Sequence, residues 1–595
     1  MLYPLSYGGS VEVYPPEHRF REAPPLANDW DYSDGSQIRK VIRLPMPKNQ
    51  LPGDAHWWRN AVVYQIYPRS FADQNGDGIG DIKGMISRVD YLSALGIDAV
   101  WLSPFYPSAL ADGGYDVDDY MDIDPRIGTL EEFDELISKL HDRNIRVFVD
   151  IVPNHSSDRH VWFQEALASE RGSAARNRYI FREGRGESGE LPPSNLASHF
   201  GPEGWTQVPD GQWYMHLFTR EQPDFNWDNP EVHQYFLDAL KFWSDRGVDG
   251  FRIDVAHALK KDLEPLPDRE SFSLSAMKAD GTDPLFDRDE VHEIYADWRK
   301  LFNQYDPPRV AVAEAWVHPE RVLRYASEDG LGQSFNFDLL AAGWSAEQFQ
   351  SKIKYNLEMS AKTGSSSTWV MSNHDVIRHA TRLAIPGLGQ SIDFFADESA
   401  WYVKNRMNPD IDLDLGLRRA KAATLLILAL PGSTYLYQGE ELGLHDVLDI
   451  PSDQMQDPQW FRGEGKLKSR DGCRVPLPWK REGSSFGFGP GGSHLPQPSW
   501  YSEVSVEAQE QDPNSTLRVY RRATALRREL YKDDQVAWLD LGPDAVAFER
   551  SGGWICVTNF GSAAIELPPG EVVVTSTDLV AGRLPADSSA WLRTS

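Results

Sequence analysis

The sequence predicts an α/β fold: a (β/α)8 TIM barrel with an inserted loop domain after the third strand and a C-terminal antiparallel β-sandwich domain. Three observations predict it. From Trp57 onward, short apolar runs alternate with amphipathic helical stretches, as expected for parallel strands joined by crossover helices. Two connections are far longer than ordinary loops. From about Thr516, apolar runs follow one another without crossover helices, which indicates antiparallel strands.

The first segment, residues 1–55, is rich in proline and polar residues and shows little periodicity, as in Tyr14-Pro15-Pro16-Glu17. This composition favours an extended arm over a packed element. We expect an N-terminal extended arm and assign it no function.

The barrel is expected to occupy residues 56–153 and 227–515. Helical stretches such as Leu130–Arg143 and Glu231–Arg246 separate most of its apolar runs. Eight strands with helices between them match the strand number of this barrel. The expected strands are Val62–Ile66, Ala99–Leu102, Val147–Val152, Val248–Ile253, Val310–Ala313, Phe335–Phe337, Thr368–Met371 and Thr434–Tyr437.

The two long connections follow the third and the eighth strand. Residues 154–226, rich in Gly, Pro, Ser and aromatic residues, are expected to form an inserted domain. A second excursion runs from Leu442 to about Glu503. Both leave from the carboxyl ends of strands, where long loops usually carry binding residues.

The C-terminal domain is expected at residues 516–595. A helix at Thr516–Leu530 leads into short segments with strand character. The expected strands are Val536–Leu541, Ala545–Arg550, Trp554–Asn559, Ile565–Leu567 and Val572–Thr575.

Composition excludes some classes of partner. Lys and Arg total 60 against 89 Asp and Glu, so the net charge of -29 disfavours nucleic acid and anionic membranes. The two cysteines, Cys473 and Cys556, are too few for a disulfide framework and fit a reducing compartment. No apolar run reaches the roughly 18 residues of a membrane span, and no signal-peptide pattern opens the chain. We expect a cytoplasmic protein with a small-molecule ligand.

The stretch Gly247–Asp254 gives the first indication of chemistry. Arg252 and Asp254 are two residues apart on a strand, so their side chains point to the same side. A neighbouring guanidinium keeps a carboxylate ionised. An ionised Asp at the carboxyl end of a barrel strand is placed to act as a nucleophile. The alternative for this stretch alone is a structural salt bridge.

Other expected strands end in polar groups as well. His155 follows the third strand, Glu314 the fifth, and His374 and Asp375 the seventh. All of them fall on the face of a barrel that carries active sites. Structural ion pairs would be scattered over both faces, so the pattern favours a catalytic centre.

These segments carry a family resemblance. Asp150–His155, Gly250–Asp254, Glu314 and Asn373–Asp375 resemble the four hallmark motifs of the α-amylase family, glycoside hydrolase family 13. Gln222–Asn226 resembles a fifth motif in the form found in its α-glucosidase and oligo-1,6-glucosidase branch, with Phe where Leu is usual. The resemblance runs from about Trp57 to the C-terminus and leaves residues 1–55 outside.

The resemblance implies a retaining glycosidase mechanism with two carboxyl groups about 5 Å apart. It implies that Asp254 is the nucleophile and Glu314 the general acid and base. Asp375 resembles the third carboxylate, which holds the 2- and 3-hydroxyl groups of the sugar. The residues that resemble further sugar-binding groups are His155, Arg252 and His374.

A second cluster concerns exo-action. Asp112–Tyr115 resembles a loop whose Asp binds the non-reducing-end glucose and whose Tyr115 stacks under it. Arg470–Arg474 resembles the loop that supplies a partner arginine. We expect a clamp between Asp112 and Arg474 that closes the site behind one glucose unit. The alternative is a surface loop and a basic turn.

A third cluster lies at Asp73–Asp81, where oxygen-bearing residues alternate with glycines, as suits a hard cation. The terminal Glu of an EF-hand loop is missing. The resemblance implies a structural Ca²⁺ or Mg²⁺, remote from catalysis. The implied ligands are Asp73, Asn75, Asp77, the Ile79 carbonyl and Asp81. The alternative is a metal-free loop of Asx turns.

Val255-Ala256-His257 after the expected nucleophile resembles α-glucosidases that act on maltose and short α-1,4 oligosaccharides, although Val255 itself is associated with α-1,6 bonds. We therefore expect an exo-acting α-glucosidase, with a homodimer left open. The alternative is an α-glucosyltransferase or a sucrose- or isomaltose-active enzyme, such as an oligo-1,6-glucosidase. No Arg-rich loop like that of sucrose isomerases occurs near residues 340–385, and a non-catalytic relative would lack the carboxylates.

Overall fold

The computed structural model describes residues 51, 53–269, 272, 276–389, 393–530 and 532–594. The expected arm at residues 1–55 lies almost wholly outside these ranges and stays a prediction.

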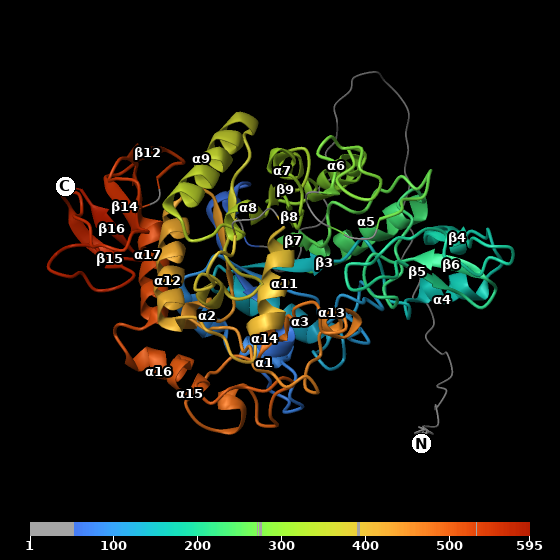
Figure 1. Ribbon diagram of the computed structural model, residues 1–595, viewed down its shortest axis with the longest axis horizontal. Helices are drawn as coiled ribbons and strands as arrows, with labels where there is room; N and C mark the ends of the chain where they lie inside the picture. The colour runs from blue at the N-terminus through green and yellow to red at the C-terminus, as the bar shows by residue number, and fades with distance from the viewer. Residues whose placement is uncertain are drawn as a thin grey trace, which may run out of the picture. The chain divides into compact units, whose positions relative to one another are not determined.

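The core is an eight-stranded parallel sheet in the strand order β10-β11-β1-β2-β3-β7-β8-β9, which is chain order carried around a barrel. Strands β3, β7, β8 and β9 are labelled near the centre of Figure 1. Its strands are β1 (Val62–Ile66), β2 (Ala99–Leu102), β3 (Arg146–Ile151), β7 (Gly250–Ile253), β8 (Val310–Ala313), β9 (Gly332–Ser334), β10 (Thr368–Val370) and β11 (Ser433–Tyr437). Almost all of their residues are buried, since helices cover one side and packed side chains fill the other. The predicted TIM barrel is confirmed.

Helices connect these strands. They are α1 (Ile82–Ile86), α2 (Val89–Leu95), α3 (Leu130–His141), α5 (Pro230–Asp245), α6 (Val291–Phe302), α7 (Pro319–Tyr325), α8 (Phe337–Leu340), α9 (Ala346–Thr363), α10 (His379–Arg382), α11 (Phe394–Asn405) and α12 (Leu413–Ala429). Helix α3 illustrates how the sequence determines where a helix begins: Thr129 and Glu132 form a capping box at its N-terminus. Its buried residues Phe133, Leu136 and Leu140 recur at helical spacing and face the barrel.

One expected barrel strand was misplaced. The segment Phe335–Phe337 follows the real strand β9, and Phe337 already begins α8. The apolar signal came from Phe335, which packs against Trp101 inside the barrel. Strand β9 itself is polar, and its buried Gln333 donates to Ser433 Oγ at 2.7 Å in the barrel interior.

The connection after β3 contains α4 (Val161–Ala168) and a three-stranded antiparallel sheet in the order β4-β6-β5. The strands are β4 (Phe181–Glu183), β5 (Trp205–Gln207) and β6 (Gln212–Met215). A backbone bridge between His155 and Asp224 ties the start of this insertion to its end. The second long connection carries α13 (Pro458–Arg462), α14 (Asp471–Arg474), α15 (Tyr501–Val504) and α16 (Val506–Gln511).

After α17 (Thr516–Leu530) comes a five-stranded antiparallel sheet in the order β12-β13-β14-β16-β15, beside α12 and α17 in Figure 1. The strands are β12 (Val536–Leu539), β13 (Ala545–Arg550), β14 (Trp554–Asn559), β15 (Glu571–Thr575) and β16 (Ser588–Arg593). This confirms the antiparallel domain. In the described residues its outer face is covered by connecting segments, including Ile565 and Leu584, which pair by a single bridge. The expected strand Ile565–Leu567 is therefore wrong, and β16 was missed.

Among the described helices, none is both long enough and apolar enough to cross a membrane.

Candidate active site

One guanidinium organises the carboxyl ends of three neighbouring strands. Arg252 Nη1 lies 2.6 Å from Asp254 Oδ1 and 2.9 Å from Asp150 Oδ1, and Nη2 lies 2.9 Å from Glu314 Oε2. The register places Arg252 directly beside Asp150 of β3 and Val312 of β8. The parallel barrel thus brings together residues that are far apart in sequence.

Glu314 is held by two further donors. Trp316 Nε1 donates to its Oε1 at 3.0 Å, and the Val255 amide donates to its Oε2 at 2.9 Å. Asp254 and Glu314 therefore face one another across the same guanidinium. Two carboxyl groups that contact the two ends of one guanidinium are compatible with a retaining glycosidase, which holds its pair about 5 Å apart.

The charge state of Asp254 depends on Arg252. Burial raises the pKa of Asp254 well above its ordinary value, Arg252 opposes this, and Glu314 raises it further. Burial likewise raises the pKa of Asp150 to about 7, against the opposing effect of Arg252. The guanidinium thus stabilises the anionic form that a nucleophile requires.

Asp375 has the opposite balance. Burial alone would raise its pKa, but His374, Arg470 and Arg474 hold the pKa well below the ordinary range. Arg474 Nη2 and Arg470 Nη1 lie 2.9 and 3.2 Å from Asp375 Oδ1. This carboxylate stays ionised and is fixed in place, as suits an acceptor for sugar hydroxyl groups.

Aromatic rings form a platform beside these carboxylates. Tyr115 and His374 are stacked with ring centroids 5.3 Å apart, and the Tyr115 hydroxyl lies 2.6 Å from His374 Nε2. Tyr67 also stacks on His374, with ring centroids 5.7 Å apart. The Tyr115 hydroxyl also donates to Asp150 Oδ2 at 3.1 Å, which links the platform to Arg252.

His155 closes the site toward the inserted segment. Its Nε2 lies 3.2 Å from the Tyr115 carbonyl and 3.0 Å from Gln222 Nε2. Burial lowers the pKa of His155 to about 3, so the ring is neutral near pH 7.

The structure corrects the expected clamp. Arg470, not Arg474, binds Asp112, with Nη2 2.7 Å from Oδ1. Arg474 turns instead to Asp375 and to the His374 carbonyl. The two arginines are one helical turn apart around α14, so both reach Asp375, and Arg470 additionally binds Asp112.

The model of the alpha amylase catalytic domain matches residues 65–396 and 398–533. The chain belongs to the α-amylase family. It is 34% identical over 541 residues to a probable alpha-glucosidase of Rhizobium meliloti (strain 1021). This alignment covers 87% of this chain and 92% of that protein. It is 35% identical over 506 residues to an oligo-1,6-glucosidase of Parageobacillus thermoglucosidasius. That alignment covers 80% of this chain and 84% of the relative.

Solved structures agree. The crystal structure of the alpha-glucosyl transfer enzyme XgtA matches with a TM-score of 0.75 and 32% identity, covering 91% of this chain and 100% of that one. Family 13 membership makes this protein a glycoside hydrolase, in the α-glucosidase branch.

Several residues of this family-13 site were not among the expected ones. Asp150 binds Arg252, and Gln222 Nε2 donates to Asp112 Oδ2 at 3.2 Å. Asp457 Oδ1 lies 2.7 Å from Arg470 Nη2 and forms a second ion pair with this arginine. Asp150 and Gln222 lie within motifs that carry the family resemblance, and this position could have identified them as site residues. Nothing in the local sequence pairs Asp457 with Arg470.

The loop expected to bind a cation is built from side-chain-to-backbone hydrogen bonds. Asp73 accepts from the Gly76 and Gly78 amides, and Asp81 from the Gln74 and Asn75 amides. Burial raises the pKa of Asp73; the two glycine amides lower it, and Asp77 and Asp81 raise it.

The oxygen donors at residues 73–81 are of the type that Ca²⁺ or Mg²⁺ prefers. In the described residues, however, no group of three or more His, Cys, Asp or Glu side chains is arranged to hold a metal ion. The metal site therefore stays a prediction.

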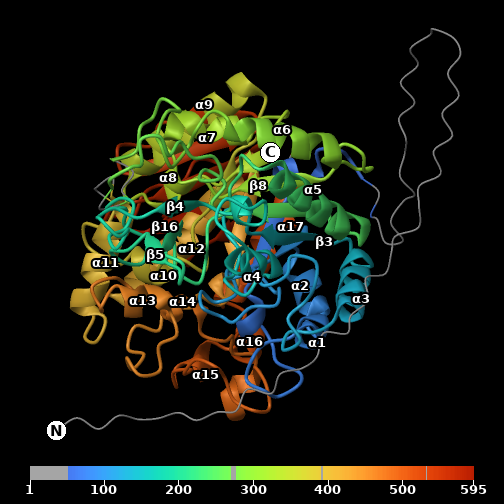
Figure 2. The same ribbon diagram turned by 90° about the vertical axis from the view of Figure 1, so that its right-hand side faces the viewer.

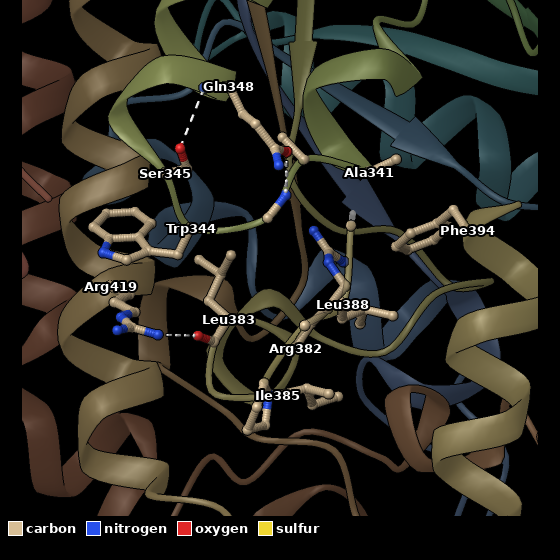
Figure 3. Close-up of a pocket in the computed structure, with 15 residues that line it drawn as sticks. Ala341, Trp344, Ser345, Gln348, Arg382, Leu383, Ile385, Leu388, Phe394 and Arg419 are labelled. Carbon is tan, nitrogen blue, oxygen red and sulfur yellow. Dashed lines mark hydrogen bonds between the residues drawn. The ribbon is translucent and has the colours of Figure 1, made fainter. Parts of the chain in front are cut away.

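A cavity of about 140 Å³ lies away from this site, between the first turn of α9 and the loop after α10 (Figure 3). Arg382, Leu383 and Arg419 line it, and Arg419 donates to the Leu383 carbonyl. Its lining includes none of the expected site residues, so it has no part in the chemistry derived from the strand ends.

Proposed function

We propose that this protein is an exo-acting, retaining α-glucosidase that releases α-glucose from the non-reducing end of maltose and short α-glucosides. The observation that supports the proposal is the guanidinium of Arg252, which binds both Asp254 and Glu314. Membership of the α-glucosidase branch supports the same conclusion.

In this proposal Asp254 attacks the anomeric carbon while Glu314 protonates the departing glycosidic oxygen. Glu314 then removes a proton from water, which attacks the glycosyl-enzyme and restores Asp254. Asp375 accepts hydrogen bonds from the 2- and 3-hydroxyl groups. His155, Arg252 and His374 bind the same glucose unit, with Tyr115 stacked beneath it.

The exo-action rests on Asp112. Its Oδ1 binds Arg470 and its Oδ2 accepts from Gln222, so the carboxylate is fixed at both oxygens. Phe200 lies under the Arg470 guanidinium at 5.0 Å. We propose that this cluster blocks the path behind the bound glucose, so that one unit is removed at a time.

The alternative is an α-glucosyltransferase or a sucrose- or isomaltose-active enzyme on the same scaffold. The likeness to XgtA and to an oligo-1,6-glucosidase favours keeping it. A product time course with maltose, isomaltose and sucrose, each at low and high concentration, decides between them. Glucose alone from maltose supports the hydrolase, whereas new oligosaccharides or isomerised sucrose support the alternative.

We also propose that the loop at residues 73–81 binds a structural Ca²⁺ or Mg²⁺ through Asp73, Asn75, Asp77, the Ile79 carbonyl and Asp81. A cation would relieve the repulsion that Asp77 and Asp81 exert on the buried Asp73. We also propose a cytoplasmic location, because both cysteines are buried and form no disulfide, as is usual in a reducing compartment. The homodimer stays a prediction.

A further inference from the structure

Lys468 and Glu398 form a deeply buried ion pair behind Asp375. Lys468 Nζ lies 2.5 Å from Glu398 Oε2, and the two side chains are 2% and 0% exposed. Glu398 belongs to α11, whereas Lys468 lies between α13 and α14. These three helices lie together in both views of the molecule (Figures 1 and 2). Charged side chains are almost never buried this fully without further partners.

Both members of the pair bind the backbone that carries Asp375. Lys468 Nζ donates to the Asp375 carbonyl at 2.5 Å, and Glu398 Oε1 accepts from the Ile377 amide at 2.9 Å. The Lys468 amide donates to Ser399 Oγ on α11 at 3.4 Å. The pair therefore connects α11 to the short segment after β10.

The same loop also fixes the side chain of Asp375. Arg470 and Arg474, which follow Lys468 closely, bind its Oδ1. Arg474 Nε additionally donates to the His374 carbonyl at 2.8 Å. The loop thus determines both where the backbone of Asp375 lies and which way its carboxylate points.

We infer that Lys468 and Glu398 are positioning residues that orient Asp375 toward the 2- and 3-hydroxyl groups of the bound sugar. The inference rests on the proposed function, because it concerns the carboxylate assigned to those hydroxyl groups. Removing one member leaves a buried charge without its partner, and the backbone or water must move to compensate. Small displacements of a group that acts on the transition state reduce the rate strongly.

The test uses two substrates, 4-nitrophenyl α-glucoside and its 2-deoxy analogue. The measured quantity is kcat/KM for the glucoside divided by kcat/KM for the 2-deoxy analogue. Asp375 contributes to this ratio through the 2-hydroxyl group. In Lys468→Met and in Glu398→Gln we expect the ratio to fall about tenfold relative to the parent protein. The double variant removes both charges, and we expect it to recover part of the lost ratio.

The matched control is Lys352→Met, which breaks a half-buried ion pair with Asp338 away from the site; its ratio should not change. If a charge-removing variant fails to fold, Glu398→Asp retains the charge but shortens the reach, and its ratio decides in the same way. An unchanged ratio in the folded variants, with only the melting temperature lowered, would overturn the inference. A parent protein that cleaves neither glucoside would instead overturn the proposed function.

Discussion

Arg470 Nη2 lies 2.7 Å from Asp112 Oδ1, and the same nitrogen lies 2.7 Å from Asp457 Oδ1. One buried arginine thus joins the loop after β2 to the long connection after β11. Asp457 fixes Arg470, and Arg470 fixes Asp112, so the proposed wall behind the glucose site is held by ionic contacts between distant segments.

The first prediction concerns this wall. Arg470→Met or Asp112→Ala should lower kcat/KM for maltose by about 100-fold, because each removes the buried ion pair between Asp112 and Arg470. The double variant should lose less than the product of the two single losses, since the two residues share the contact between Asp112 and Arg470. Arg462→Met removes a nearby, partly exposed arginine and serves as the control. Unchanged kcat/KM in Asp112→Ala would remove the basis for exo-action.

The second prediction concerns Asp254, the proposed nucleophile. Asp254→Asn keeps the shape of the side chain but removes its charge, so kcat on 4-nitrophenyl α-glucoside should fall by about four orders of magnitude or more. The melting temperature should stay level or rise, because burial and Glu314 both disfavour the charged form. Asp262→Asn, an exposed carboxylate, is the control. A near-parental rate in Asp254→Asn would show that another group is the nucleophile.

The barrel could be predicted because its strands are short, apolar and separated by amphipathic helices. The expected bounds of Val62–Ile66, Ala99–Leu102 and Val310–Ala313 coincide with β1, β2 and β8. Strand β9 could not be found this way, since its residues are polar and are satisfied only by hydrogen bonds inside the barrel, such as that of Gln333.

The positions of Asp254 and Glu314 could be predicted because each directly follows a strand, so the barrel alone brings them together, whereas Asp375 follows β10 after a short loop. The contacts of Arg470 and Lys468 could not. They depend on how the long, irregular connection after β11 folds back over the barrel. The sequence of this connection has no apolar periodicity from which its path could be predicted. Two arginines a helical turn apart gave no local signal to decide which one reaches Asp112.

The third prediction concerns pH. Burial and the neighbouring Arg382 and Arg378 lower the pKa of His379 to about 3. Between about pH 6.5 and 3 the unfolded chain therefore binds a proton that the folded protein does not, and stability falls as the pH is lowered.

From pH 7 to pH 5, the free energy of unfolding should fall by about 2 kcal/mol less in His379→Gln than in the parent protein. Denaturant unfolding at the two pH values measures this difference. Ser372→Ala removes the hydrogen bond between Ser372 Oγ and His379 Nδ1 but retains the titrating ring, so its pH dependence should match the parent. Equal pH dependence in His379→Gln and the parent would show that the ring is already charged at pH 5.

The fourth prediction concerns the cation loop. A ligand that binds only the folded state at 100 times its Kd stabilises it by about 2.7 kcal/mol. Added Ca²⁺ or Mg²⁺ should therefore raise the melting temperature of chelator-treated protein, and Asp73→Asn should abolish the rise. Asp90→Asn, an exposed carboxylate, should retain it. If neither cation changes the melting temperature of the parent protein, the loop is a metal-free set of Asx turns.

The stereochemistry of the released sugar tests the central claim most directly. Proton NMR of the first minutes of 4-nitrophenyl α-glucoside hydrolysis distinguishes the two anomers before they interconvert. Attack by Asp254 and then by water inverts the anomeric carbon twice, so we predict that α-glucose appears first and the β-anomer only later. Initial release of β-glucose would mean a single displacement by water, and it would contradict the roles given to Asp254 and Glu314.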